Sequence, residues 1–228
     1  VEDPGSPIYL DENIISQPAA ALQLVAKEIF RMSDQVRDIL KKTIELVKNE
    51  EVKSIDGLKE NGEQVERLGK CITEYLAALF SSGLLTEQQA AQTASLMCVL
   101  SDVERMGTLS VEMAECMLER SDRKYKYTPE AMDELQKSLK VLNKMFCDSL
   151  KALQGDDGIE PGKMMKRKDK LLDLDIKMRK AHIERVNKGK CKASLTAPFT
   201  NILHLIDRMG NSCINLADVA ESGTSMKY

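Results

Sequence analysis

The chain has 228 residues, of which 43% are hydrophobic, 30% are charged and 4% are aromatic, with a formal net charge of −3. This composition is typical of amphipathic helices and predicts an all-α protein, while the near balance of acids and bases argues against nucleic acid as a partner. No apolar run approaches the roughly 20 residues that a membrane-spanning helix needs. The six cysteines form no Cys-x-x-Cys pair, so the sequence indicates neither a zinc site nor a disulfide framework.

Helix signals divide the first half of the chain into a lead-in and three helices. Residues 1–17 are rich in turn formers and do not begin with Met, so we interpret them as a lead-in from an upstream region. Pro18 occupies the favoured first position of a helix that we expect to run to about Lys48. A second stripe of apolar residues follows Ser54 and stops at Gly83.

The third helix is expected to open with a capping box, in which the side chains of Thr86 and Gln89 each bond the other residue's backbone N–H. We expect this helix to end near Arg120. Residues 18–120 would then form a first three-helix unit.

The second unit is expected over residues 128–222 and repeats this order of helices. It opens at Thr128, a favoured helix cap that is followed by a proline. The turn at 155–158 separates its first two helices, Gly189 ends the second, and residues 194–221 form the third. Six helices joined by short turns predict two antiparallel three-helix bundles.

The third helices of the two units carry the same motif. Residues 104–107 read Glu-Arg-Met-Gly and residues 207–210 read Asp-Arg-Met-Gly, at an offset of 207 − 104 = 103. In the second helices, Val65 matches Leu171 at an offset of 171 − 65 = 106. A shared motif with an acid in the same place indicates duplication of one unit, so we expect a pseudo-twofold relation between the bundles.

A family resemblance rests on these motif copies. Residues 206–218, Ile-Asp-Arg-Met-Gly-Asn-Ser-Cys-Ile-Asn-Leu-Ala-Asp, resemble the third-helix signature of the PhoU family, and residues 103–115 are their partner. Residues 179–185, together with 8–12 and 18–22, are similar more narrowly to the cytoplasmic PhoU-like tail of bacterial sodium-phosphate cotransporters.

This resemblance implies a regulatory domain of a sodium-dependent phosphate transporter-like protein, acting in phosphate uptake and homeostasis from the cytoplasmic face of the plasma membrane. Its partner would be the membrane portion of the same protein or another phosphate-transport component, and self-association is a further option. Two alternatives are a free-standing PhoU-like metal-binding regulator and a helical interaction module that needs no metal.

The resemblance also implies a metal site, because PhoU relatives bind metal ions through an acid-x-x-x-Asp pair on the third helix of each unit. The leading acids here are Glu104 and Asp207, but the trailing positions hold Thr108 and Asn211. Each change removes a negative charge and keeps an oxygen, so we predict weak binding of a divalent or ferric ion, or none. The alternative for the acids is solvation or an ion pair.

Two neighbouring side chains could complete such a site. Asp102 lies close to Glu104 in the sequence, and His204 precedes Asp207 by three residues, a spacing that puts an imidazole and a carboxylate on one helical face. Packing or capping at a helix interface is the alternative for His204.

Arginine and glycine recur in both motif copies. A glycine inside a helix permits close approach of another helix, and the arginines could brace the acids across the contact between the units or bind phosphate. We therefore expect the following residues at the interface between the repeats: Arg105, Gly107, Arg208 and Gly210.

The fifth helix has a basic stretch over residues 163–170, continued by Lys177, Arg179 and Lys180. This stretch could rest against anionic lipid heads or an acidic partner, or it could be a solvated face.

Catalytic motifs that would indicate an enzyme are absent from the sequence. A di-iron bundle needs Glu-x-x-His pairs, and the residues three before His182 and His204 are Arg179 and Asn201. The His-Glu-x-x-His, Gly-x-Ser-x-Gly and Gly-x-x-x-x-Gly-Lys motifs are not found either. We therefore do not expect catalysis.

Overall fold

The computed structural model describes residues 2–50, 52–118, 124–156, 158–160, 162–223 and 226. These residues contain six α-helices, three short 3₁₀ turns and no strand, which confirms the prediction of an all-α protein. The helices are α1 (Pro18–Asn49), α2 (Ile55–Ser81), α3 (Glu87–Leu118), α4 (Pro129–Leu153), α5 (Lys163–Asn187) and α6 (Thr196–Glu221). None of the described helices combines the length and the apolar character of a membrane-spanning segment.

Local capping signals set where the helices begin. The Thr128 hydroxyl accepts a hydrogen bond from the backbone N–H of Ala131 at 3.2 Å. At the start of α3, the backbone N–H of Thr86 donates to the Gln89 side chain at 3.0 Å, and the backbone N–H of Gln89 donates to the Thr86 hydroxyl at 3.1 Å. Both caps are confirmed, because a cap depends only on residues within one turn.

The start of one helix differs from the sequence-based expectation, and the end of another is not described. The last helix begins at Thr196 and not at residue 194, because residues 193–195 form a separate 3₁₀ turn. The third helix is described through Leu118, and its expected end near Arg120 lies outside the described residues. The unit boundaries at 120 and 128 therefore stay predictions.

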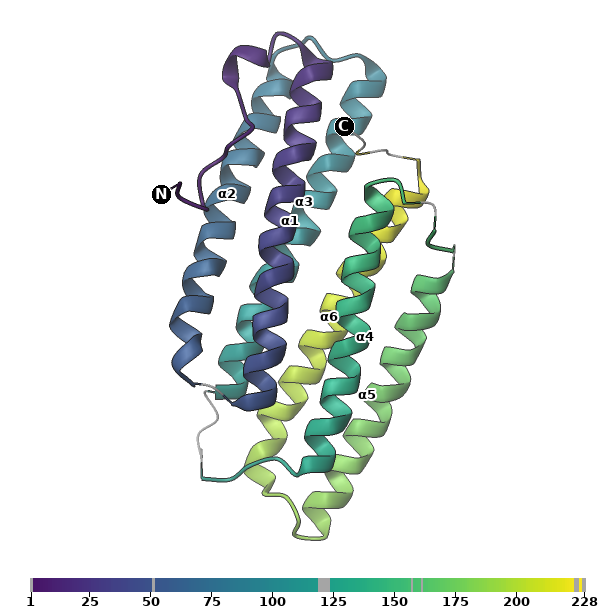
Figure 1. The fold of residues 1–228 in the computed structure, drawn as a ribbon. Helices are drawn as coiled ribbons and strands as arrows, with labels where there is room; N and C mark the ends of the chain where they lie inside the picture. Colours follow the sequence, from purple (N-terminus) through teal and green to yellow (C-terminus); the bar gives the residue numbers. More distant parts are fainter. Residues whose placement is uncertain are drawn as a thin grey trace.

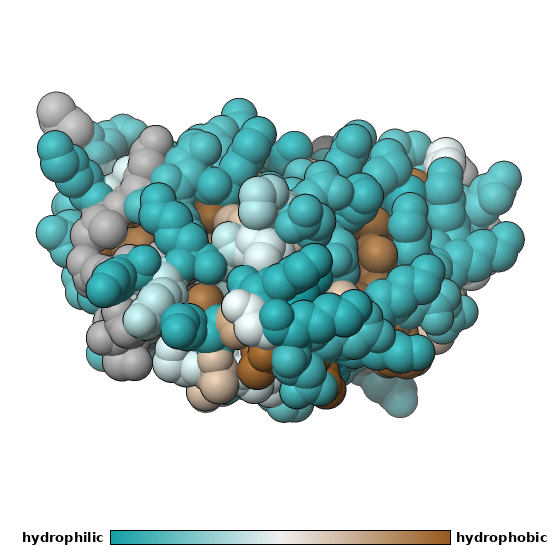
Figure 2. All heavy atoms as spheres, turned by 90° about the horizontal axis from the view of Figure 1, so that it is seen from below, coloured by the Kyte–Doolittle hydropathy of each residue, from teal (hydrophilic) through white to brown (hydrophobic). Residues whose placement is uncertain are grey.

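The helices form two antiparallel three-helix bundles, α1–α3 and α4–α6, side by side (Figure 1). The bundles meet mainly through α3 and α6, with α1 against α4, while α2 and α5 lie at opposite outer edges. Seen from below, one end of the molecule is covered mainly by hydrophilic side chains (Figure 2). The two motif copies on α3 and α6 therefore lie at the centre of the molecule.

The lead-in is held on the first bundle by a buried carboxylate. Glu28 of α1 is 0% exposed, and its Oε1 accepts hydrogen bonds from the backbone N–H groups of Ile8 at 2.6 Å and Tyr9 at 2.8 Å. Its Oε2 accepts from Nε of Arg31 at 2.7 Å. The lead-in is thus a packed part of the first bundle, and its origin in an upstream region stays a prediction.

The glycines of the motif face within their own bundles. A Cβ atom at Gly107 would lie 3.4 Å from a methyl group of Val36 on α1 and 3.6 Å from one of Val65 on α2. One at Gly210 would lie 3.2 Å from a methyl group of Leu171 on α5. Val65 and Leu171 are the pair matched at an offset of 171 − 65 = 106, so equivalent glycines contact equivalent residues. This corrects the expectation that the glycines lie between the repeats, because the close approach they permit is to other helices of their own bundle.

Candidate functional site

The interface between α3 and α6 contains a buried carboxylate. Asp102 of α3 is 6% exposed, and its Oδ1 accepts hydrogen bonds from Nδ2 of Asn215 on α6 at 3.3 Å and from Nη1 of Arg105 at 3.5 Å. Burial raises the pKa of Asp102, and the contacts with Asn215 and Arg105 only partly oppose this effect. Asp102 and Asn215 therefore link the two repeats directly.

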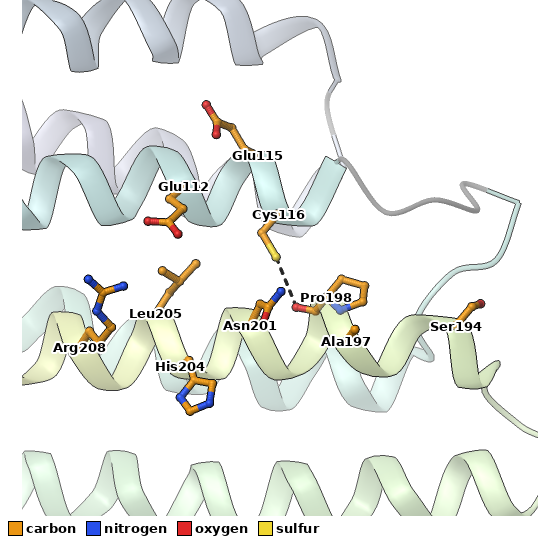
Figure 3. A pocket seen from close by; sticks show the side chains of 10 residues that line it. All are labelled: Glu112, Glu115, Cys116, Ser194, Ala197, Pro198, Asn201, His204, Leu205 and Arg208. Carbon is orange, nitrogen blue, oxygen red and sulfur yellow. Dashed lines mark hydrogen bonds between the residues drawn. The ribbon is translucent and has the colours of Figure 1, made fainter.

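A groove with a volume of about 580 Å³ opens between the same two helices (Figure 3). Glu112 points from α3 toward α6, whereas Arg208 and Leu205 point from α6 toward α3. The ring of His204 points away from α3. Within the described part of the chain, neither Arg208 nor Glu112 forms an ion pair. The other lining residues are Glu115, Cys116, Ser194, Ala197, Pro198 and Asn201.

The duplication relates this groove to the closed contact around Asp102. The offset 215 − 112 = 103 maps Glu112 onto Asn215, and the same offset maps Asp102 onto Leu205 and Arg105 onto Arg208. Because Leu205 supplies no carboxylate, Arg208 lacks the partner that Arg105 has. Equivalent positions thus make a hydrogen-bonded contact at one end of the interface and an open charged groove at the other.

The acid of the first motif copy points toward the outer helix of its bundle. Glu104 is half-buried, and a Cβ atom at Gly69 of α2 would collide with its carboxylate. Burial, and to a smaller extent the charge of Glu66, raise the pKa of Glu104. Among the described residues Glu104 has no hydrogen-bond or ion-pair partner. The absence of a side chain at Gly69 therefore creates the space that Glu104 fills.

The acid of the second copy is neutralised by a lysine. The Nζ atom of Lys168 on α5 lies 2.5 Å from Oδ1 of Asp207 and also donates to the Asp207 carbonyl oxygen at 3.3 Å. The position that matches Lys168 in the first repeat is Gly62, since 168 − 62 = 106. There a groove of about 210 Å³ stays open, lined by Gly62, Glu63, Glu66 and Thr108 among others. Lys168 thus supplies a positive charge at a position where the first repeat has none.

Comparisons with known proteins agree with this architecture. Residues 29–117, from α1 to α3, match the family model for the PhoU domain. This match covers most of the first bundle. The chain is also 24% identical over 206 residues to the phosphate-specific transport system accessory protein PhoU homolog 1 of Thermotoga maritima. The aligned region covers 89% of this chain and 86% of that protein. No solved structure matches the chain significantly.

The predicted ligands of the PhoU-type metal site do not come together. Glu104 points toward α2, Asp207 is paired with Lys168, and Asp102 bonds across to α6. Thr108, Asn211 and His204 are exposed. Among the described residues, no three His, Cys, Asp or Glu side chains gather closely enough to hold a metal ion. The donors present therefore do not fit a tight metal centre, and weak binding stays a prediction.

The arginines of the two motif copies differ from each other in a way that the sequence did not reveal. Arg105 pairs with Asp102 on its own helix, so it braces the interface only through that acid. Arg208 lines the groove between the repeats. Sequence reasoning also missed Lys168 as the partner of Asp207. The offset of 168 − 62 = 106 aligns Lys168 with Gly62 of the first repeat, and this difference between the repeats could have indicated it.

Proposed function

We propose that this chain is a non-catalytic regulator of phosphate transport that acts as a PhoU-type accessory protein. The observation that carries the proposal is the similarity to an accessory protein of a phosphate-specific transport system, which extends over 89% of this chain and so includes both repeats. This similarity favours an accessory role over that of a sodium-phosphate cotransporter tail, because it spans 86% of the accessory protein itself.

The groove between α3 and α6 is the surface we assign to a phosphate-transport component. Arg208 and Glu112 support this assignment, because they present charges of both signs that no described residue pairs. A protein segment with complementary charges would complete both pairs at once. The cytoplasmic location that the resemblance implies stays a prediction.

Phosphate uptake tests this function. In a bacterium that lacks its own PhoU accessory protein, we measure the initial rate of radiolabelled orthophosphate uptake at high and low external phosphate, with and without this chain. The chain should restore the reduction of uptake at high phosphate. Uptake that stays unchanged, with the protein present at normal levels, would contradict the proposed function.

A matched pair of variants tests the groove. Arg208→Ala removes the open positive charge and should weaken the control of uptake, whereas Lys48→Ala, at an exposed position at the end of α1, should not. Equal effects of the two variants would overturn the assignment of the groove. The helical circular dichroism of both variants checks that they are folded.

A further inference from the structure

The outward face of α5 carries a stripe of large apolar side chains. Met165, Leu172, Ile176 and Ile183 are 52%, 52%, 56% and 59% exposed, and they are four of the eight large apolar side chains found exposed in the described residues. A neighbouring face, which lies about 100° around the helix because its residues come one position earlier, packs inward through Met164, Leu171 and Met178. Helix α5 is therefore apolar on two faces, of which the fold buries only one.

The spacing of this stripe is that of a helix-pairing seam. Successive members are separated by 172 − 165 = 7, 176 − 172 = 4 and 183 − 176 = 7 residues, which places them at the a and d positions of a heptad repeat. A stripe restricted to these positions is narrow and matches the width of one partner helix. The two remaining seam positions hold Asp169 and Arg179. Charges of both signs thus interrupt the apolar stripe, which suits a protein partner that can supply the opposite charge at each.

The seam is symmetric about the level of Leu174. Met165 and Ile183 are each nine residues from it, since 174 − 165 = 183 − 174 = 9. Leu172 and Ile176 are each two residues away, since 174 − 172 = 176 − 174 = 2. The charged pair, Asp169 and Arg179, follows the same rule with 174 − 169 = 179 − 174 = 5. An acid on one side is thus balanced by a base on the other.

We propose that α5 pairs in antiparallel orientation with α5 of a second copy of this chain, about a twofold axis at the level of Leu174. A twofold axis brings each residue opposite the one at the same distance on the other side. Met165 of each copy then meets Ile183 of the other, and Leu172 meets Ile176. Asp169 of each copy meets Arg179 of the other. The charges as well as the apolar side chains of the seam are complementary to a second copy of itself.

The side chains at the charged positions are available for this contact. Asp169 is exposed and has no ion-pair partner among the described residues. Arg179 bonds Asp175 through Nε at 2.9 Å, which leaves its Nη atoms for a second carboxylate. Asp169 and Arg179 are ten residues, or about 15 Å, apart along one helix, so they cannot pair within a single chain. Any coupling between them is therefore intermolecular.

The dimer is expected to be weak and to depend on concentration. The seam from Met165 to Ile183 is about 27 Å long, so it buries less area than a standard interface, and we expect a Kd of about micromolar or weaker. Asp173 lies one residue from the level of the axis and would face Asp173 of the second copy. The repulsion between these two carboxylates also limits the affinity.

Sedimentation of the full chain over micromolar to submillimolar concentrations tests the pairing. The wild type should pass from monomer to dimer, and Ile176→Lys should weaken the dimer by at least about tenfold. Phe80→Lys, which changes an exposed apolar residue on α2, is the matched control and should leave the Kd unchanged. A wild type that stays monomeric, even if it binds anionic vesicles through Ile176, would overturn the proposal, as would a dimer that survives Ile176→Lys.

Charge reversal tests the orientation. Asp169→Arg and Arg179→Asp should each weaken the dimer, because each brings like charges together across the axis. The double variant restores opposite charges and should recover most of the wild-type affinity. If the double variant is as weak as the single ones, the antiparallel register is wrong. Circular dichroism of each variant checks that α5 is intact.

Discussion

The Nζ atom of Lys168 lies 2.5 Å from Oδ1 of Asp207, so the acid of the second motif copy is neutralised by the outer helix of its own bundle. In the first repeat the matching position is Gly62, and the acid there, Glu104, has no cationic partner among the described residues. The duplicated motif is therefore conserved in sequence between the halves but differs in electrostatics.

Removing Lys168 and restoring the lost acid should create a cation site in the second repeat. In the double variant Lys168→Ala with Asn211→Asp, two carboxylates stand one turn apart without a competing ammonium group. Titration calorimetry with Mn²⁺ should show binding at least about tenfold tighter than in the wild type. The control is Lys170→Ala with Asn211→Asp, which removes an exposed lysine of α5. Equal affinities of the two double variants would show that Lys168 does not block the site.

The raised pKa of Glu104 predicts a loss of stability with rising pH. Because the folded state binds the proton of Glu104 more tightly than the unfolded state, stability is highest below the ordinary glutamate pKa and falls as the pH rises through the raised value. Glu104→Gln cannot ionise, so it should have a higher Tm than the wild type at neutral pH and a flatter pH profile.

Thermal unfolding followed by circular dichroism over a series of pH values measures this difference. Glu60→Gln, at an exposed position of α2, serves as the control and should stay within about 0.5 kcal/mol of the wild type. A Tm of Glu104→Gln below that of the wild type at neutral pH would contradict the interpretation.

The link between the repeats should be sensitive to one added charge. Asn215→Asp replaces the donor to Asp102 with a second carboxylate, and we expect a loss of about 1–3 kcal/mol in the free energy of unfolding at neutral pH. Acidification should recover part of this loss, because it protonates the carboxylate pair. Urea unfolding measures it, and Asn211→Asp, exposed on the same helix, is the control. Equal losses in the two variants would mean that the Asp102–Asn215 bond has no special role.

The buried Glu28 should be important for stability. Glu28→Ala leaves the Arg31 guanidinium and the backbone N–H groups of Ile8 and Tyr9 without their acceptor, so we expect a loss of about 3–5 kcal/mol. Urea unfolding measures the loss, and limited proteolysis should show earlier cleavage of the lead-in. Glu45→Ala, exposed on the same helix, should change stability by less than about 0.5 kcal/mol. A lead-in that stays protected in Glu28→Ala would contradict this role.

The sequence predicts the parts of the fold that depend on short-range signals. The caps at Thr86 and Thr128 act within one turn, and the apolar periodicity of each helix identifies its buried face, so the helices and their two bundles could be predicted. The offset between Glu104 and Asp207 identified the duplication without any structure.

The direction of the motif side chains could not be predicted in the same way. Whether Glu104 turns toward α2 depends on the space left by Gly69, which is 104 − 69 = 35 residues away in the sequence. The pairing of Asp207 depends on Lys168 of a neighbouring helix. The faces of α3 and α6 that meet each other are set by the packing of both bundles, so the groove beside Arg208 became visible only in the structure.

The central proposal is that this chain contacts a phosphate-transport component through the groove between α3 and α6. Site-specific photocrosslinking in living cells tests it most directly, with the photoreactive residue placed at Asn201 in the groove or at the exposed Lys48 as control. We expect a crosslink from Asn201 to a protein of the phosphate transport system, identified by mass spectrometry, and none from Lys48. A chain that controls phosphate uptake but gives no such crosslink from Asn201 would contradict the account.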